Sequence, residues 1–148
     1  MSLKKYQAKR KFIKTTEPKG KVRKKNLSHF VVQKHQARSL HYDFRLELDG
    51  VLKSWAVPKG IPEKRGVKHL AVQVEDHPVE YFNFSGIIPE GEYGAGRVEI
   101  WDKGKWELIK GSLKEGSIKF SLAGERLKGE WVLVQLKDKK NWIIFKYQ

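Results

Sequence analysis

Residues 41–57 read HYDFRLELDGVLKSWAV, and this stretch decides the fold. Within residues 41–48 the apolar side chains stand at every second position, which is the period of a strand with one buried face. Asp49 and Gly50 then supply the two-residue signal of a tight turn, and an apolar run follows at 51–57. The stretch therefore predicts an antiparallel β-hairpin.

Similar patterns continue on both sides of this hairpin. From Phe30 onward, short runs rich in Val, Ile, Phe, Tyr and Trp alternate with glycine turns, and helical periodicity is weak. Further strands are predicted at 30–35, at 69–75, on both sides of a turn at Asp102-Lys103-Gly104, at 118–122 and 131–136 around a turn at 124–129, and at 141–147. Many short strands at this spacing are typical of a barrel or a sandwich, and closure into a barrel removes exposed edges. We expect a mainly β fold, a compact closed β-barrel with little helix.

Positive charge is concentrated at the start of the chain. The 148 residues carry a formal net charge of +14, and residues 1–28 hold eleven Lys/Arg and one acid, Glu17. We therefore divide the chain into a basic N-terminal arm, 1–28, and a nearly balanced β-barrel domain, 29–148. Such charge favours a polyanionic partner, nucleic acid or an anionic membrane. The arm is either a phosphate-gripping extension or a solvated tail.

The composition excludes several classes of protein. No apolar run approaches the roughly 18 residues that a membrane span needs, and the basic start is not followed by the apolar segment of a secretory signal. Cysteine is absent, which excludes disulfides, a thiolate nucleophile and a zinc-thiolate site. We expect one soluble cytoplasmic domain without membrane attachment, in which any metal is held by histidine, carboxylate or backbone.

All the histidines lie in one part of the chain, namely His29, His35, His41, His69 and His77. Strand alternation places His41, Asp43 and Arg45 on one face of the predicted strand at 41–48, opposite its apolar residues. In the strand that begins at position 69, the same alternation sets a polar row against an apolar row. The polar row is His69, Gln73, Glu75 and His77, and the apolar row is Leu70, Val72 and Val74. Two polar rows that face each other across a small barrel would form a site.

The side chains His35, His41, Asp43 and His77 are the candidate metal ligands. Two or three imidazoles with one carboxylate suit a divalent ion such as Mn²⁺, Zn²⁺ or Fe²⁺, whereas Mg²⁺ and Ca²⁺ prefer oxygen ligands alone. Arg45, two residues from Asp43, has the forked geometry that binds phosphate oxygens. A single histidine is more often a surface or hydrogen-bonded residue, and we interpret His29 in this way.

Five motifs follow one another along the chain. They are QKH at 33–35, LHYDFRLE at 40–47, SWAVPKG at 54–60, VEDHP at 74–78 and IPEGEYGAG at 88–96. Together they resemble the 3′-phosphoesterase module of bacterial and archaeal DNA-repair ligase D, over nearly the whole chain. The resemblance implies a compact β-barrel and a manganese-dependent repair of 3′ ends during end joining. In that reaction a terminal ribonucleoside is removed, and the remaining 3′-phosphate is hydrolysed to a 3′-hydroxyl.

The resemblance also implies roles for the polar residues. His35, Asp43 and His77 would hold the metal, which is Mn²⁺ or, as alternatives, Zn²⁺, Co²⁺ or another divalent transition metal. His41 and Arg45 would be catalytic and would contact the scissile phosphate, and His41 could instead protonate the leaving oxygen.

Further residues of the resemblance would support the reaction. Lys59, Glu75 and Tyr81 would line the same pocket as catalytic residues, and Arg10 and Glu17 of the arm would bind nucleic acid. The chain departs from the family pattern at two positions. Lys11 stands where the family has an acid, and His69 stands where many relatives have a phosphate-facing arginine.

The expected partners are nucleic-acid 3′ ends, on DNA or on an RNA/DNA primer-template. The ligase and polymerase domains that usually accompany the module are missing from this sequence. We therefore expect a freestanding monomer that cooperates with a separate DNA ligase, polymerase or Ku-like end-binding protein.

Two other functions fit parts of the sequence. His41-x-Asp43 with a distant His77 is also the ligand spacing of iron(II) oxygenases, although these normally have larger barrels and the basic arm would be unexplained. A non-catalytic nucleic-acid-binding barrel would use aromatic side chains to stack bases and lysines to follow the backbone. That alternative explains the charge but leaves the His/Asp row without a role.

Overall fold

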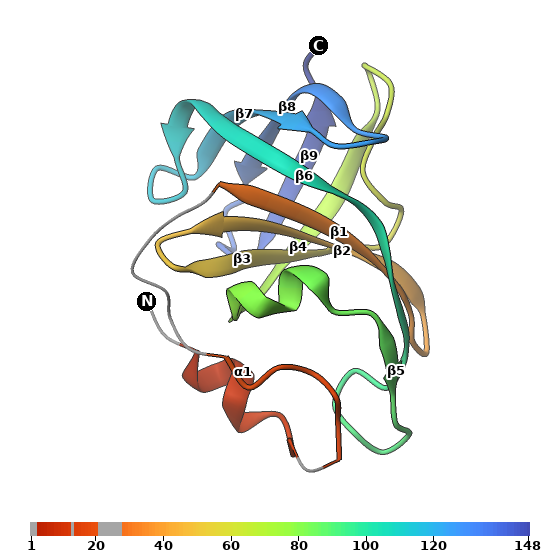
Figure 1. The fold of residues 1–148 in the computed structure, drawn as a ribbon. Helices are drawn as coiled ribbons and strands as arrows, with labels where there is room; N and C mark the ends of the chain where they lie inside the picture. Colours follow the sequence, from red (N-terminus) through yellow and green to blue (C-terminus); the bar gives the residue numbers. More distant parts are fainter. Residues whose placement is uncertain (1–2, 13, 21–27) are drawn as a thin grey trace.

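The computed structural model describes residues 3–12, 14–20 and 28–148 (Figure 1). The elements in chain order are α1 (Lys4–Ala8), β1 (His29–Gln36), β2 (Leu40–Leu48), β3 (Val51–Val57), β4 (Lys68–His77), the 3₁₀ helix η1 (Val79–Asn83), β5 (Gly86–Ile88), β6 (Gly96–Ser112), β7 (Ser117–Ala123), β8 (Lys128–Gln135) and β9 (Asn141–Lys146). The predicted mainly β fold with little helix is confirmed. No helix in the described ranges is both long enough and apolar enough to cross a membrane.

The strands form a closed barrel. Their order in the sheet is β1-β2-β3-β4-β9-β8-β7-β6-β5, all neighbours are antiparallel, and β1 also pairs with β6. The second pairing of β1 closes eight strands into a ring, while β5 adds to β6 outside it. Closure pairs the strand edges with one another, as expected from the sequence.

The β2–β3 hairpin forms as predicted. Leu48 pairs with Val51 across a turn of two residues. Both turn residues have left-handed backbone conformations, with φ of 54° at Asp49 and 82° at Gly50. This is the turn geometry whose twist matches that of the flanking strands, and it explains why Asp-Gly stands here.

The turn predicted at Asp102-Lys103-Gly104 is wrong, because β6 runs through it as one strand of 17 residues. The buried carboxylate of Asp102 instead accepts hydrogen bonds from the backbone N–H groups of Glu125 and Leu127, at 2.8 and 2.9 Å. A side chain on Gly104 would meet the carbonyl oxygen of Ala123 at 2.1 Å. The polar and glycine signal therefore reflects tertiary contacts with the β7–β8 turn.

Apolar side chains fill the barrel interior. They include Phe44, Trp55, Phe120, Trp131 and Trp142, all with at most 1% of their surface exposed. A second, smaller apolar cluster lies outside the barrel wall and consists of Tyr6, Leu52, Tyr81, Phe84, Ile88 and Val98. Figure 1 shows η1 and α1 lying outside the wall formed by β1, β2 and β3. This part of the wall is therefore covered on both faces.

Candidate active site on the outer face of the barrel

The polar face of β2 points out of the barrel. Residues that pair across antiparallel strands share a face, and Asp43 pairs with Gln33 while His41 pairs with His35. Phe44 of the same strand lies in the apolar interior. The expectation of two polar rows facing each other across the interior is therefore wrong. Aromatic side chains occupy that space, and the site lies on the outer wall beneath the arm and η1.

The alternation predicted for β4 is also wrong. Val74 pairs with Ser54 on the outer face, whereas Gln73 pairs with the interior Trp55. A register irregularity then follows, so that His77 pairs with Leu52 and returns to the outer face. Such a bulge adds one residue and re-aims the side chains beyond it.

One cavity of about 330 Å³ gathers most of the predicted site residues. Those that line it are Arg10, Glu17, His35, His41, Asp43, Arg45, Glu75, His77 and Tyr81. Among the described residues, Lys59 and His69 do not line it. Lys59 is exposed, and a ring nitrogen of His69 lies 2.6 Å from the carbonyl oxygen of Gly60. His29 lies elsewhere, with Nδ1 3.3 Å from Glu47.

His35, His41 and Asp43 form the tightest group of possible metal ligands. One ligand atom from each lies within 4.8 Å of the others. Asp43 Oδ2 is 3.4 Å from Nδ1 of His35, and Asp43 Oδ1 is 3.4 Å from Nε2 of His41. His77 lines the same cavity but lies outside this group.

Backbone carbonyls orient both imidazoles of this group. Nε2 of His35 lies 2.7 Å from the carbonyl of Gly94, and Nδ1 of His41 lies 3.1 Å from that of Ser39. A carbonyl only accepts hydrogen bonds, so these nitrogens carry the protons. When the ring is neutral, the proton on the nitrogen that faces Asp43 is absent and this nitrogen presents a lone pair, which is the arrangement that a metal-binding histidine requires; in the protonated ring the same nitrogen donates to Asp43.

The charged groups and the burial of the cavity shift the pKa values of its ionisable residues in different directions. Burial would raise the pKa of the Asp43 carboxyl, but the charge of Arg45 and hydrogen bonds from His35 and His41 hold that pKa well below its usual range. A hydrogen bond to Asp43 raises the pKa of His41 against the effect of burial. Burial, together with the charges of Arg45 and Arg10, lowers the pKa of His77. Asp43 is therefore ionised and His77 neutral near pH 7.

In the metal-free protein, the His41–Asp43 pair is expected to stabilise the fold more at about pH 5.5 than at about pH 8.5. A group whose pKa is raised by folding contributes its stability below the unfolded value, about 6.5 for histidine, and loses it as the pH rises through the folded value. We expect His41→Gln to lower the unfolding temperature by about 2–4 °C at the lower pH and by less at the higher pH, measured by circular dichroism with a chelator. In an Asp43→Asn background the effect should become independent of pH, and persistence of the pH dependence there would contradict the assignment.

Arg45 is held with one nitrogen unused. Its Nε donates to Gln33 Oε1 at 2.7 Å, and Nη2 lies 3.6 Å from Asp43 Oδ2. Its buried Nη1 has no hydrogen-bond partner in the part of the chain that the structure describes. The Gln33 amide donates in turn to the carbonyls of Tyr81 and Phe84. Sequence reasoning missed this positioning role of Gln33, although Gln33 shares the outward face with Asp43.

The described part of the arm forms a wall of the cavity. Arg10 Nε donates to Glu17 Oε2 at 2.9 Å, and the Tyr81 hydroxyl donates to the same oxygen at 2.6 Å. Arg10 Nη2 lies 3.3 Å from His77 Nε2, and its guanidinium lies 3.9 Å from the ring centre of Tyr6.

This packing excludes the interpretation as a solvated tail for residues 3–12 and 14–20. The basic residues within 21–27 lie outside the described residues. Lys11, at the position where the resemblance implies an acid, is exposed and does not line the cavity as the described residues define it.

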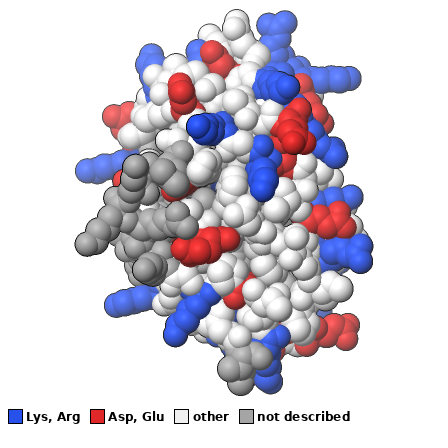
Figure 2. Space-filling view, in the orientation of Figure 1, with Lys and Arg blue, Asp and Glu red and all other residues white. Residues whose placement is uncertain are grey.

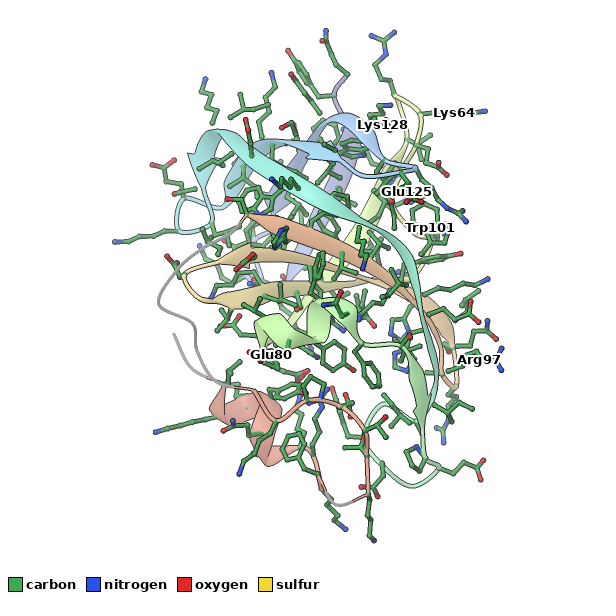
Figure 3. The ribbon with its side chains drawn as sticks, in the orientation of Figure 1. Lys64, Glu80, Arg97, Trp101, Glu125 and Lys128 are labelled. Carbon is green, nitrogen blue, oxygen red and sulfur yellow. The ribbon has the colours of Figure 1, made fainter. Side chains whose placement is uncertain are left out.

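Replacing Glu17 by Ala is expected to detach the arm. Arg10 and Glu17 both have at most 5% of their side-chain surface exposed, and removing one partner leaves a buried charge unpaired, at a cost of about 3 kcal/mol. Hydrogen exchange at the amide of Gln7, which donates to the carbonyl of Leu3 at 2.8 Å, should therefore accelerate, and proteolysis within residues 3–20 should become faster. Glu125→Ala, which removes an exposed acid, is the matched control (Figure 3). Equal protection of the Gln7 amide in both variants would contradict the role of Glu17.

The chain matches a known protein family. Residues 33–135 match the family described as the DNA ligase D 3′-phosphoesterase domain. The chain belongs to this family. The 3′-phosphoesterase domain is 50% identical, over 95% of its length, to the multifunctional non-homologous end joining protein LigD of Pseudomonas aeruginosa. It is 48% identical over 93% of its length to LigD of Mycolicibacterium smegmatis and 46% identical over 80% to LigD of Mycobacterium tuberculosis.

The 3′-phosphoesterase domain corresponds to only a part of these relatives, namely 18%, 19% and 17% of their respective lengths. Family membership indicates a hydrolase that acts on phosphoester bonds, and the group His35, His41 and Asp43 fits a metal-dependent enzyme. The iron(II) oxygenase and the non-catalytic binding barrel are both less consistent with this family.

Proposed function

We propose that the chain is a metal-dependent 3′-end phosphoesterase. It would remove a 3′-terminal ribonucleoside and then the 3′-phosphate, leaving a 3′-hydroxyl for DNA repair by end joining. The observation that supports this most strongly is the shared cavity, in which His35, His41 and Asp43 converge beside Arg45, whose buried Nη1 has no hydrogen-bond partner among the described residues. A metal-ligand group next to a buried cationic donor is suited to a phosphate ester.

The donor set fits a divalent transition metal. Two imidazoles in their neutral form and one ionised carboxylate suit Mn²⁺, and also Zn²⁺ or Co²⁺. We propose His35, His41 and Asp43 as the ligands, so that His41 takes the metal-binding role that the resemblance implied for His77. A bound ion would polarise a phosphoryl oxygen and lower the pKa of a water molecule.

The remaining residues of the cavity would bind and orient the ester. Arg45 Nη1 would donate to a non-bridging phosphate oxygen and offset the charge that grows there during hydrolysis. Neutral His77 accepts a hydrogen bond from Arg10, so that Arg10 is directed into the cavity. We leave Lys59 and His69 out of this proposal because both lie outside the cavity.

The substrates and partners follow from the resemblance and belong to the same proposal. The substrate would be the 3′ end of a DNA strand or of an RNA/DNA primer on a template. A DNA ligase, a polymerase or a Ku-like end-binding protein would act before or after it.

The test is hydrolysis of two labelled primer-templates, one ending in a single 3′-ribonucleotide and the other in a 3′-phosphate. With Mn²⁺ both should be converted to 3′-hydroxyl ends, and with a chelator neither should react. Conversion of the 3′-phosphate alone would remove ribonucleoside release from the proposal and would point to Lys11. No conversion with Mn²⁺, Zn²⁺ or Co²⁺ would refute the proposal and favour a non-catalytic nucleic-acid-binding barrel.

A further inference from the structure

Two grooves lead away from the candidate active site. The first, here called the lysine groove, has a volume of about 830 Å³ and shares Val74, Glu75 and Tyr93 with the cavity. The second, here called the glycine groove, has a volume of about 880 Å³ and shares Ala37 and Gly94 with it. Either surface could hold a strand whose 3′ end enters the cavity.

Charge distinguishes the two grooves. The lysine groove is lined by five lysines, namely Lys4, Lys5, Lys9, Lys139 and Lys140, and by two acids. Both acids are already paired, since Glu75 lies 2.6 Å from Lys9 and Asp76 lies 3.0 Å from Lys53. The glycine groove is lined by one arginine and two acids, Glu90 and Glu92. A polyanion is attracted by the first groove and repelled by the second.

The net charge of the whole chain does not indicate which of the two grooves binds the strand. On the face shown in Figure 2, lysines and arginines are spread around the outline and are interspersed with acids. The position of the lysine groove, continuous with the cavity, is therefore the informative feature.

One wall of the lysine groove is a rigid turn between β8 and β9. Asp138 accepts hydrogen bonds from the backbone N–H groups of Lys140 and Asn141, at 3.0 and 2.8 Å. The carbonyl of Lys140 accepts from the backbone of Gln73 at 2.8 Å, and Lys139 has a left-handed φ of 66°. The exposed side chains of Lys139 and Lys140 thus project from a backbone that is fixed before any ligand binds, which reduces the entropy cost of binding.

The other wall is α1. Its Tyr6 is fully buried and meets the ring of His77 edge-on, at 4.8 Å between ring centres, while Lys4, Lys5 and Lys9 are exposed. Lys9 Nζ donates to the hydroxyl of Tyr93 at 3.3 Å. Tyr93, 46% exposed, therefore stands where the groove meets the cavity.

We propose that the strand 5′ to the processed end lies in the lysine groove, with its phosphates between α1 and the β8–β9 turn. The proposal rests on the proposed function, since that function places the 3′ end in the cavity. It adds a binding site for the sugar–phosphate backbone and a direction in which the strand leaves the cavity. Contacts of this kind bind the phosphates without reading the base sequence.

The test compares two double variants that each remove two positive charges. K139N/K140Q changes the groove, and Asn is suited to the left-handed position. K64Q/K128Q is the matched control, because both lysines are exposed and lie far from α1 in Figure 3. The first measurement is binding of a labelled 3′-hydroxyl single strand in chelator, followed by fluorescence anisotropy over a range of salt concentrations. We expect K139N/K140Q to weaken binding roughly 10-fold at low salt and to reduce the salt slope by about 1.4, while the control stays close to wild type.

The second measurement is hydrolysis of a nucleoside 3′-phosphate and of a long 3′-phosphorylated strand. K139N/K140Q should raise the KM of the long strand and leave the turnover of the nucleoside 3′-phosphate unchanged. If both double variants weaken binding equally, or if K139N/K140Q binds like wild type, the groove proposal is wrong. Absence of turnover of either substrate by the wild-type protein with all three ions would instead refute the proposed function, and the binding measurement would still test the groove.

Discussion

Replacing Asp43 by Asn is expected to lower metal-dependent hydrolysis of a 3′-phosphate by at least about 10³-fold. The carboxylate lies at the centre of the site, within 3.4 Å of both His35 and His41 and 3.6 Å from Arg45. Asn removes the negative charge that would hold the ion and that orients both imidazoles. Steady-state kinetics with Mn²⁺, together with calorimetric titration of Mn²⁺ binding, would measure the two effects separately.

The same substitution also disturbs a buried ion pair, so stability has to be measured beside activity. Loss of the Asp43 charge leaves Arg45 without its ionic partner and is expected to cost about 3 kcal/mol in free energy of unfolding. Glu47→Gln is the matched control, because Glu47 is a buried carboxylate on the same face of β2 but does not line the cavity. That variant should lose stability and keep its activity. Equal loss of activity in both variants would show that Asp43 acts only through folding.

Replacing Arg45 by Lys is expected to lower kcat for the same substrate by about 10²- to 10³-fold. The guanidinium uses Nε for Gln33 and Nη2 for Asp43, and its buried Nη1 has no partner among the described residues. A lysine carries one ammonium group and cannot hold all three positions at once. Because the Nη1 donor would act mainly on charge that develops during hydrolysis, kcat should fall more than the affinity for substrate.

The control for Arg45 is Arg97→Lys, the same change at an exposed position (Figure 3). It should leave both kcat and KM unchanged. If Arg45→Lys raises KM alone, Arg45 binds the substrate without contributing to the reaction step, and the role proposed for Nη1 would have to be abandoned.

The sequence predicted the fold well because strand alternation and turn chemistry are local properties. The Asp49-Gly50 hairpin and the alternation of β2 could be derived from neighbouring residues alone. Which face of β2 lies inside the barrel could not, since that depends on the pairing of β1 with β6, far apart in the chain. In β4, an irregularity between Val74 and His77 places His77 on the outer face although Gln73 lies on the inner face, and no residue in that segment signals it.

The sequence predicted which residues form the site better than it predicted how these residues contact one another. Motif resemblance identified Arg10 and Glu17, but their contacts with His77 and Tyr81 join residues more than sixty positions apart. Periodicity cannot reveal such contacts. For His69 the sequence predicted a place in the site that the residue does not have. It belongs to the predicted polar row, yet it lies against the carbonyl of Gly60.

The barrel wall serves two purposes on its two faces. Its inner face contacts a closed aromatic core, whereas its outer face, with the arm and η1, holds the candidate chemistry. Substitutions on the outer layer can therefore alter substrate preference while the inner packing stays intact. This separation makes the domain a suitable scaffold for directed evolution, in which libraries confined to exposed positions of the arm, of η1 and of residues 89–95 would sample new specificities at little risk of unfolding the barrel.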